Sequence, residues 1–253
     1  HSYEDFLNTY TWCREAGFQN INVDLMAALP YQTVESYTTG LRKIIRLAPE
    51  HISAYSLILE EGTPFYQKYN SGCYPLPDEE QERLMYRETE QILAQAGYER
   101  YEISNYAKKG YACRHNLVYW QGGDYLGLGL GSSSYMDDVR FHNTTDLDTY
   151  VNQGAYVEDR EELSVQAKME EFMFLGLRVM AGVSGTEFEK RFGKTMEDVY
   201  GDVLRKHEEE GLLQIERKED RKEAAAAEPA KGKTNIGCIF TGVKDGKEKT
   251  IYI

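Results

Sequence analysis

The residues best suited to chemistry gather in one central segment, from Tyr111 to Tyr135. Within it stand a thiol at Cys113, an imidazole at His115 and an amide at Asn116, followed by aromatic side chains. Thiolate and imidazole are both donors that transition metals accept. No amphipathic helix or strand needs such a mixture together with five glycines, so the segment predicts a ligand site.

A purely structural role for the same residues stays open beside the functional one. A lone histidine more often bonds to nearby backbone than to a metal. Leu126, Leu128 and Leu130 alternate with glycines, which predicts a strand with one face free of side chains. A flat ligand can approach such a face, and so can another strand or helix. The glycines do not indicate a dinucleotide-binding loop, because no apolar helix follows them.

The composition limits the partners of the chain. Its 253 residues are enough for one large domain or two ordinary ones. The 42 acidic and 29 basic residues give a formal net charge of −13, which argues against binding to nucleic acid or to an anionic membrane surface. No apolar run is long enough to span a bilayer, and no basic and apolar leader opens the chain.

Cysteine spacing indicates a reducing environment. The four cysteines are far apart and none belongs to a C-x-x-C pair; they are Cys13, Cys73, Cys113 and Cys238. Neither a disulfide framework nor a zinc site is therefore predicted, and a cytoplasmic location is expected.

The elements that must position the central segment begin with an α/β pattern. Residues 20–29 predict a buried parallel strand, Thr33 the N-cap of a helix, and residues 51–59 a second strand. Strand, helix and strand make a βαβ unit. Ligands of such units sit at the carboxyl ends of the strands, here residues 29–33 and 60–64.

Asp24 is the one charged residue inside the first predicted strand. A buried carboxylate is costly unless it is hydrogen-bonded or paired. We therefore expect Asp24 either to hold a ligand near the mouth of the strands or to be satisfied by neighbouring backbone.

Further helices and a strand are expected around this unit. Residues 1–17 predict an amphipathic helix, and Asp78 caps a longer helix that ends at Gly97. The expected buried stripe of the longer helix is Leu84, Met85, Ile92, Leu93 and Ala96. A strand is expected at residues 98–107, and after about Asp138 the pattern becomes helical.

The later part of the chain predicts a second domain and a tail. Residues 141–216 show helix, turn, helix and a short strand at 212–215, the outline of a winged-helix-like domain. Its second helix is too acidic to read DNA, which favours a packing domain or a lid. Residues 217–233 predict a linker, and residues 234–253 a β-hairpin that turns near Asp245.

Four ordered motifs give the chain a resemblance to a known family. They are Val23–Met26 leading into Leu29–Thr33, then Glu60–Pro64, Tyr101–Ala107 and His115–Trp120, the last reading H-N-x-x-Y-W. Over residues 1–216 the chain resembles the oxygen-independent coproporphyrinogen III oxidase-like radical SAM proteins, and within them the heme chaperone branch, HemW. The tail from Thr234 to Ile253 resembles saccharopine dehydrogenase-like (carboxynorspermidine synthase) proteins, which indicates a fusion or a misassembled reading frame.

The resemblance implies a fold and a set of site residues. It implies the later half of a partial (β/α) radical SAM barrel over residues 1–140, followed by the helical C-terminal domain over residues 141–216. Asp24 and Met26 are then expected to hold S-adenosylmethionine. The residues expected to meet heme or porphyrin are Cys113, His115, Asn116, Tyr119 and Trp120, with His115 as the ligand of the heme iron.

The family motif that is missing from the chain bears on its activity. The C-x-x-x-C-x-x-C motif, whose thiolates hold the 4Fe–4S cluster, is absent and is expected upstream of His1. The chain alone is therefore expected to be catalytically inactive, with the cluster confined to a full-length parent.

Two functional hypotheses follow. The first is a cytoplasmic heme chaperone that passes heme to acceptor proteins, with membrane association only through those acceptors and an oligomeric state left open. Here Cys113 and His115 offer axial donors, and Arg114 can meet a propionate. The second is an oxygen-independent coproporphyrinogen III oxidase, a radical enzyme of porphyrin biosynthesis. The H-N-x-x-Y-W segment favours the first hypothesis, and an inert fragment remains a third, because an incomplete barrel exposes strand edges.

Overall fold

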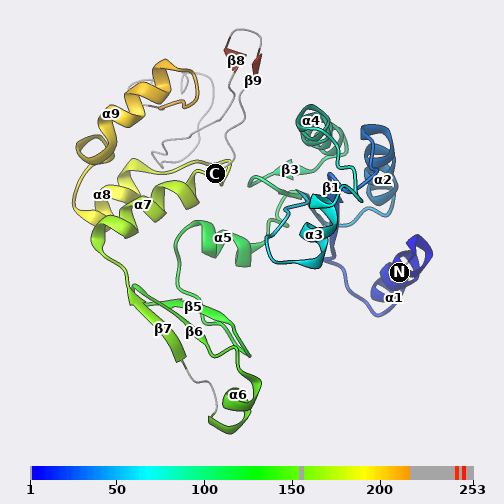
Figure 1. Ribbon diagram of the computed structural model, residues 1–253. Coiled ribbons are helices and arrows are strands. Elements are labelled where there is room, and N and C mark those ends of the chain that lie inside the picture. Colours follow the sequence, from blue (N-terminus) through cyan, green and yellow to red (C-terminus); the bar gives the residue numbers. More distant parts are fainter. Residues whose placement is uncertain (1, 154–156, 217–242, 245–246, 249–253) are drawn as a thin grey trace. The chain divides into compact units, whose positions relative to one another are not determined.

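The computed structural model describes residues 2–153, 157–216, 243–244 and 247–248, and the chain forms two compact units that divide after Cys113 (Figure 1). The first unit contains α1 (Tyr3–Glu15), β1 (Asn22–Ala27), α2 (Val34–Arg46), β2 (His51–Ser56), α3 (Pro64–Asn70), α4 (Glu79–Gln95), β3 (Glu99–Arg100) and β4 (Asn105–Ala107). The second unit contains α5 (Arg114–Trp120), β5 (Ser133–Met136), β6 (Val139–Asn143), α6 (Leu147–Gln153), β7 (Val157–Glu162), α7 (Val165–Gly176), α8 (Gly185–Phe192) and α9 (Met196–Glu209), with β8 (Val243–Lys244) and β9 (Lys247–Glu248).

The first unit is built on the predicted βαβ arrangement. β1 and β2 are parallel, with Asn22 opposite His51, and the sheet has the order β1-β2-β4-β3. Thr33 caps α2 as predicted, in a reciprocal pair of hydrogen bonds with Ser36 that satisfies backbone groups at the helix start. The α/β prediction for this part of the chain is confirmed.

One face of this sheet carries the core of the unit. Leu41 of α2, Ile52 of β2 and Leu93 of α4 are fully buried there in one cluster. Asp78 caps α4 with Gln81 as the reciprocal partner, as predicted. Two members of the predicted stripe, Leu84 and Ala96, are instead exposed. The buried side chains of α4 are Met85, Thr89, Ile92 and Leu93, and the Thr89 hydroxyl is hydrogen-bonded to that of Tyr37 at 2.7 Å.

The strand expected at residues 98–107 is a short hairpin. β3 and β4 pair antiparallel on either side of a turn, with Arg100 opposite Tyr106. The turn is closed by Glu102, whose buried carboxylate accepts hydrogen bonds from the Ser104 amide at 2.8 Å and the Asn105 side chain at 2.5 Å. A carboxylate placed to bond its own backbone offers the chain a turn in place of an extended strand, and the alternation of the sequence did not reveal this.

The glycine-faced strand expected at residues 126–131 does not form. These residues are irregular and lie along β5, where a Cβ on Gly127 would stand 2.2 Å from the Ser133 carbonyl oxygen. The Gly127 amide donates to the Ser134 hydroxyl at 3.0 Å, and the Asn143 side chain donates to the Gly129 carbonyl at 2.8 Å. What approaches Gly127 is therefore the backbone of the next strand.

The second unit contains a three-stranded antiparallel sheet that the sequence analysis did not predict. Its order is β5-β6-β7, and β5 turns into β6 through Asp137 and Asp138, both with positive φ. Aspartate tolerates the left-handed region and can form a two-residue hairpin turn. The acidic composition of β7 gave no apolar alternation by which the strand could be recognised.

Helices α7, α8 and α9 enclose the core of the second unit around fully buried Phe188. Gly193 ends α8 in the left-handed conformation that glycine adopts readily. The short strand expected at residues 212–215 is absent: these described residues have no regular structure, although Leu213 is buried in the same core. The domain boundary near residue 140 stays a prediction.

Most of the linker and tail predicted for residues 217–253 lies outside the described residues. Among the described residues of the tail, β8 and β9 pair antiparallel, with Lys244 opposite Lys247. This pairing agrees with the turn expected near Asp245. The resemblance of the tail to another family stays a prediction.

Candidate functional site

Helix α5 presents His115 to solvent. The helical spacing of four residues places Tyr119 on the same face, and the two rings meet edge to face with centroids 4.8 Å apart. The Tyr119 hydroxyl lies 3.0 Å from Nε2 of His115, which is hydrogen-bond distance. His115 is exposed and Tyr119 half-buried, so the imidazole is held by a fixed partner while it stays accessible.

Tyr119 is in turn anchored to the sheet of the second unit. Its ring contacts Tyr125 edge to face at 4.5 Å between centroids. Tyr125 and Tyr135 of β5 exchange backbone hydrogen bonds of 2.8 and 2.9 Å in an isolated antiparallel bridge. Because Tyr135 is buried, the aromatic series from His115 to Tyr135 is fixed at its sheet end.

Ionic contacts hold the hairpin of β5 and β6 to α7. The Asp138 carboxylate pairs with Lys168 at 2.6 Å and accepts a hydrogen bond from the Tyr135 hydroxyl at 3.2 Å. The bond from Lys168 lowers the pKa of Asp138, whereas burial and the adjacent carboxylate raise the pKa of Tyr135. Arg140 and Glu171 form a second pair at 2.9 Å between β6 and α7.

Trp120 lies at the end of α5 under a cation. The guanidinium of Arg178 stands 4.3 Å from the centre of its ring, a favourable cation–π distance. The indole Nε1 is buried and has no hydrogen-bond partner among the described residues. Asn116 is half-buried in the same helix. Cys113 is half-buried and is the last residue of the first unit, whereas His115 belongs to the second.

The loop after Tyr125 exposes apolar side chains. Leu126, Leu128 and Leu130 are 62%, 85% and 44% exposed. The glycines between them are hydrogen-bonded to the side chains of Ser134 in β5 and Asn143 in β6, whereas the leucine side chains are exposed. Exposed apolar residues in one short stretch are typical of surfaces that meet an apolar ligand or partner.

Asp24 and Met26 share one face of β1 in the first unit. Asp24 is exposed and not buried as expected, and its carboxylate accepts a hydrogen bond of 2.6 Å from the side chain of Asn22. Successive residues of a strand point to opposite faces. The helix-covered face of β1 therefore carries buried Val23 and Ala27, and the other face carries Asn22, Asp24 and half-buried Met26. Only the expected burial of Asp24 was wrong, because the helices of the first unit cover the opposite face of this sheet; its role in holding a ligand stays a prediction.

A polar network that the sequence analysis missed lies on the same face. Buried His51 has Nδ1 2.6 Å from the side-chain oxygen Oδ1 of Asn22 and Nε2 2.8 Å from the Tyr101 hydroxyl. Burial lowers the pKa of His51, and the Asp24 carboxylate opposes that effect. The signal in the sequence was a histidine, His51, at the start of an apolar strand. Ser53, two positions later, also donates a hydrogen bond to the Asn22 side chain.

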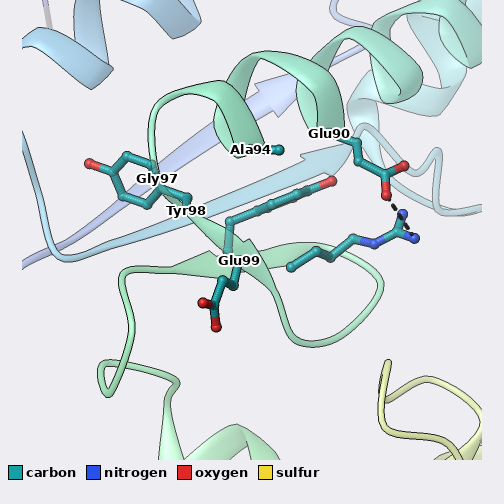
Figure 2. Close-up of a pocket in the computed structure, with 7 residues that line it drawn as sticks. Glu90, Ala94, Gly97, Tyr98 and Glu99 are labelled. Atoms are coloured by element: carbon teal, nitrogen blue, oxygen red, sulfur yellow. Dashed lines mark ion pairs between the residues drawn. The ribbon is translucent and has the colours of Figure 1, made fainter. Parts of the chain in front are cut away.

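A cavity of about 360 Å3 lies elsewhere in the first unit, where the end of α4 meets β3 and β4 (Figure 2). It is lined by Glu90, Ala94, Gly97, Tyr98, Glu99, Arg100 and Tyr106. Figure 2 shows Glu90 directed toward the guanidinium with which it pairs, that of Arg100 at 3.3 Å. None of the predicted site residues lines this cavity.

The described residues show neither a metal-ligating cluster nor a membrane-spanning helix. No group of three or more histidine, cysteine, aspartate or glutamate side chains is arranged to hold a metal ion. Within the same residues, no helix is both long and apolar enough to cross a bilayer.

Sequence comparisons relate the chain to two named groups of proteins. Residues 163–219 match the family model of the HemN C-terminal domain. The chain is 36% identical over 217 residues to the heme chaperone HemW of Bacillus subtilis, a match that covers 84% of this chain and 57% of that protein. It is 39% identical over 194 residues to the heme chaperone HemW of Lactococcus lactis, covering 76% and 51%. The chain therefore spans about half the length of these relatives.

A comparison with solved structures supports the fold. The coproporphyrinogen III oxidase HemN of Escherichia coli, described as a radical SAM enzyme, matches with a TM-score of 0.69 and 20% identity, covering 85% of this chain and 54% of that one. At this identity the likeness shows the fold alone. It confirms the prediction of an α/β radical SAM fold with a helical C-terminal part.

Proposed function

Because the chain belongs to the family that contains the HemW heme chaperones and carries a HemN C-terminal domain, we propose that its parent protein binds heme and delivers it to acceptor proteins. The observation that carries the proposal is the exposed imidazole of His115 in the H-N-x-x-Y-W segment. In this proposal heme is cargo that must both enter and leave the site.

The chemistry of the second unit fits such a cargo. His115 would supply an axial nitrogen to the iron. Exposed Arg114, one residue earlier, would meet a propionate. The exposed leucines at 126, 128 and 130 offer apolar area for a macrocycle, with Tyr119 beside His115 and Trp120 at the end of the same helix. Cys113 and Asn116 belong to the proposed site by family resemblance only.

The proposal extends to cofactors of the full-length parent. Asp24 and Met26 would hold S-adenosylmethionine, since an exposed carboxylate on an open sheet face can accept hydrogen bonds from hydroxyl or amino groups. The chain lacks the C-x-x-x-C-x-x-C motif, and its described residues offer no cluster of metal ligands, so they do not fit a 4Fe–4S cluster. No step of the proposed function of this chain is assigned to one. A cytoplasmic setting, with membrane contact only through acceptors, is part of the same proposal.

The hypothesis of a coproporphyrinogen oxidase has less support than that of a heme chaperone. Its structural relative shares 20% identity, whereas the heme chaperones share 36% and 39%. The name of the structural relative describes that protein alone.

A hemin titration tests the proposed site. We expect the intact chain to bind hemin with a Soret band, and His115→Ala to weaken binding by about tenfold or more, because the iron loses a coordinate bond. The matched control is His207→Ala, which removes an imidazole from α9 of the same unit. Equal affinity and an equal spectrum for the His115→Ala variant would remove His115 from the site.

A further inference from the structure

The Nε2 nitrogen of His115, which is the ring nitrogen farther from the backbone, is already occupied. Nε2 lies 3.0 Å from the Tyr119 hydroxyl, and no described residue contacts Nδ1 by a hydrogen bond. A heme iron that approaches this imidazole therefore meets either a capped nitrogen or an uncapped one.

The uncapped nitrogen is poorly placed for heme. Nδ1 is one ring atom away from the Cβ of His115, and a metal–nitrogen bond is only about 2 Å long. A porphyrin lies across that bond, so its macrocycle would press against the Cβ and against the backbone of α5. Nε2, on the far side of the ring, is free of this obstacle. Iron can use it only if Tyr119 gives way.

We propose that Tyr119 is a displaceable cap on His115, which competes with heme iron for Nε2. The inference rests on the proposed heme-binding function and deepens it, since it assigns to one hydroxyl the control of how tightly the cargo is held. Tyr119 is a positioning residue in this scheme and contributes no bond to the iron.

The exchange needs only one ring tautomer. With its proton on Nδ1, the imidazole accepts a hydrogen bond at Nε2 from the Tyr119 O–H. When hemin binds, that hydrogen bond breaks, the Nε2 lone pair forms the bond to iron, and the axial water of hemin leaves. The phenolic proton stays on Tyr119, whose hydroxyl turns to solvent. No electron is transferred.

The surroundings of Tyr119 favour its return. Its ring is held edge to face by Tyr125 at 4.5 Å, and Tyr125 is bridged to buried Tyr135 of β5. These contacts define the position to which the Tyr119 side chain returns, so its hydroxyl competes for Nε2 whenever the iron dissociates. Such a competitor lowers the affinity and helps the imidazole to release iron, which suits a protein that must hand its cargo on.

Tyr119→Phe tests the cap, because it keeps the ring contact and removes only the hydroxyl. We expect the variant to bind hemin roughly two- to tenfold more tightly, the range that corresponds to the net worth of one hydrogen bond. Transfer of hemin to an excess of apomyoglobin should slow. Tyr111→Phe, an exposed tyrosine four residues before His115, is the matched control and should behave as the unchanged chain.

The outcomes separate this inference from the proposed function. If His115→Ala does not weaken hemin binding, the proposed site fails, and the cap with it. If His115→Ala weakens binding while Tyr119→Phe binds equally or more weakly, the site stands and the cap is wrong. A weaker Tyr119→Phe variant with an altered ferric spectrum would make the phenol itself an axial ligand. In the double variant, Tyr119→Phe should have no effect without the imidazole.

Discussion

At the scale of single residues, Glu50 joins separate segments of the first unit through one carboxylate. It pairs with Arg14 of α1 at 2.8 Å and accepts a hydrogen bond from the Ile21 amide at 3.1 Å, with Lys108 3.7 Å away. Burial acts to raise the pKa of Glu50, but these bonds outweigh it and hold the pKa below its usual value.

Glu50→Gln should therefore destabilise the first unit in a manner that depends on pH. We expect it to lower the free energy of unfolding by about 1–3 kcal/mol near neutral pH, the worth of a hydrogen bond to a charged group. A carboxylate with a lowered folded pKa stabilises the fold above its unfolded pKa, and the effect is lost as pH falls through the folded value. Denaturant unfolding at pH 7 and pH 3 measures this, and a difference that persisted undiminished at pH 3 would contradict it.

The side chains of the candidate site were predictable in type but less so in setting. The motif placed His115 and Tyr119 four residues apart, and helical spacing brings such residues together. The identity of the nitrogen that meets the hydroxyl depends on the rotamers of both rings, which no pattern states. Asp24 was expected to be buried because its neighbours are apolar. A sequence cannot show that helices of the first unit cover only the other face of its sheet.

At the scale of elements, Gly40 lies inside α2 with open space around it. A Cβ built at this position meets no atom within 4 Å. Gly40→Ala should therefore raise the free energy of unfolding of the first unit by about 0.5–1 kcal/mol, since alanine loses less conformational freedom than glycine in a helix. Thermal melting would show the gain. A lower melting temperature would mean that the flexibility of α2 stabilises the unit.

Gly127→Ala should instead lower the free energy of unfolding of the second unit. Its Cβ would stand 2.2 Å from the Ser133 carbonyl, and a collision with backbone cannot be relieved by turning a side chain. We expect the loop that carries Leu126, Leu128 and Leu130 to shift away from β5, with faster proteolysis of the loop and weaker hemin binding. Unchanged cleavage and unchanged affinity would show that the loop can move without consequence.

Elements with a strong local signal were predicted well. The caps at Thr33 and Asp78 and the parallel pair of β1 and β2 follow from residue type and apolar runs. The three-stranded sheet of the second unit was missed, because β7 is mostly acidic and almost wholly exposed. The hairpin of β3 and β4 was read as one strand, since its turn is made by the buried carboxylate of Glu102.

At the scale of the whole molecule, the chain holds about half the length of its heme chaperone relatives. It contains four cysteines without cluster spacing. Anaerobic reconstitution with iron and sulfide should therefore leave the chain without a stable 4Fe–4S cluster, whereas hemin binding by the same sample should persist. Stoichiometric iron and sulfide with cleavage of S-adenosylmethionine would overturn this expectation, as would a hemin affinity that rises and falls with cluster content.

The two tryptophans of the chain are divided between its units. Trp12 on α1 is 64% exposed in the first unit, and Trp120 lies under Arg178 in the second. Their fluorescence should differ: exposed Trp12 should emit at longer wavelength, and shielded Trp120 at shorter wavelength. A Trp12→Phe variant would then contain a single tryptophan, which lies on the same short helix as His115. Quenching of the Trp120 fluorescence by bound porphyrin would then report the rates of heme binding and release without any attached dye.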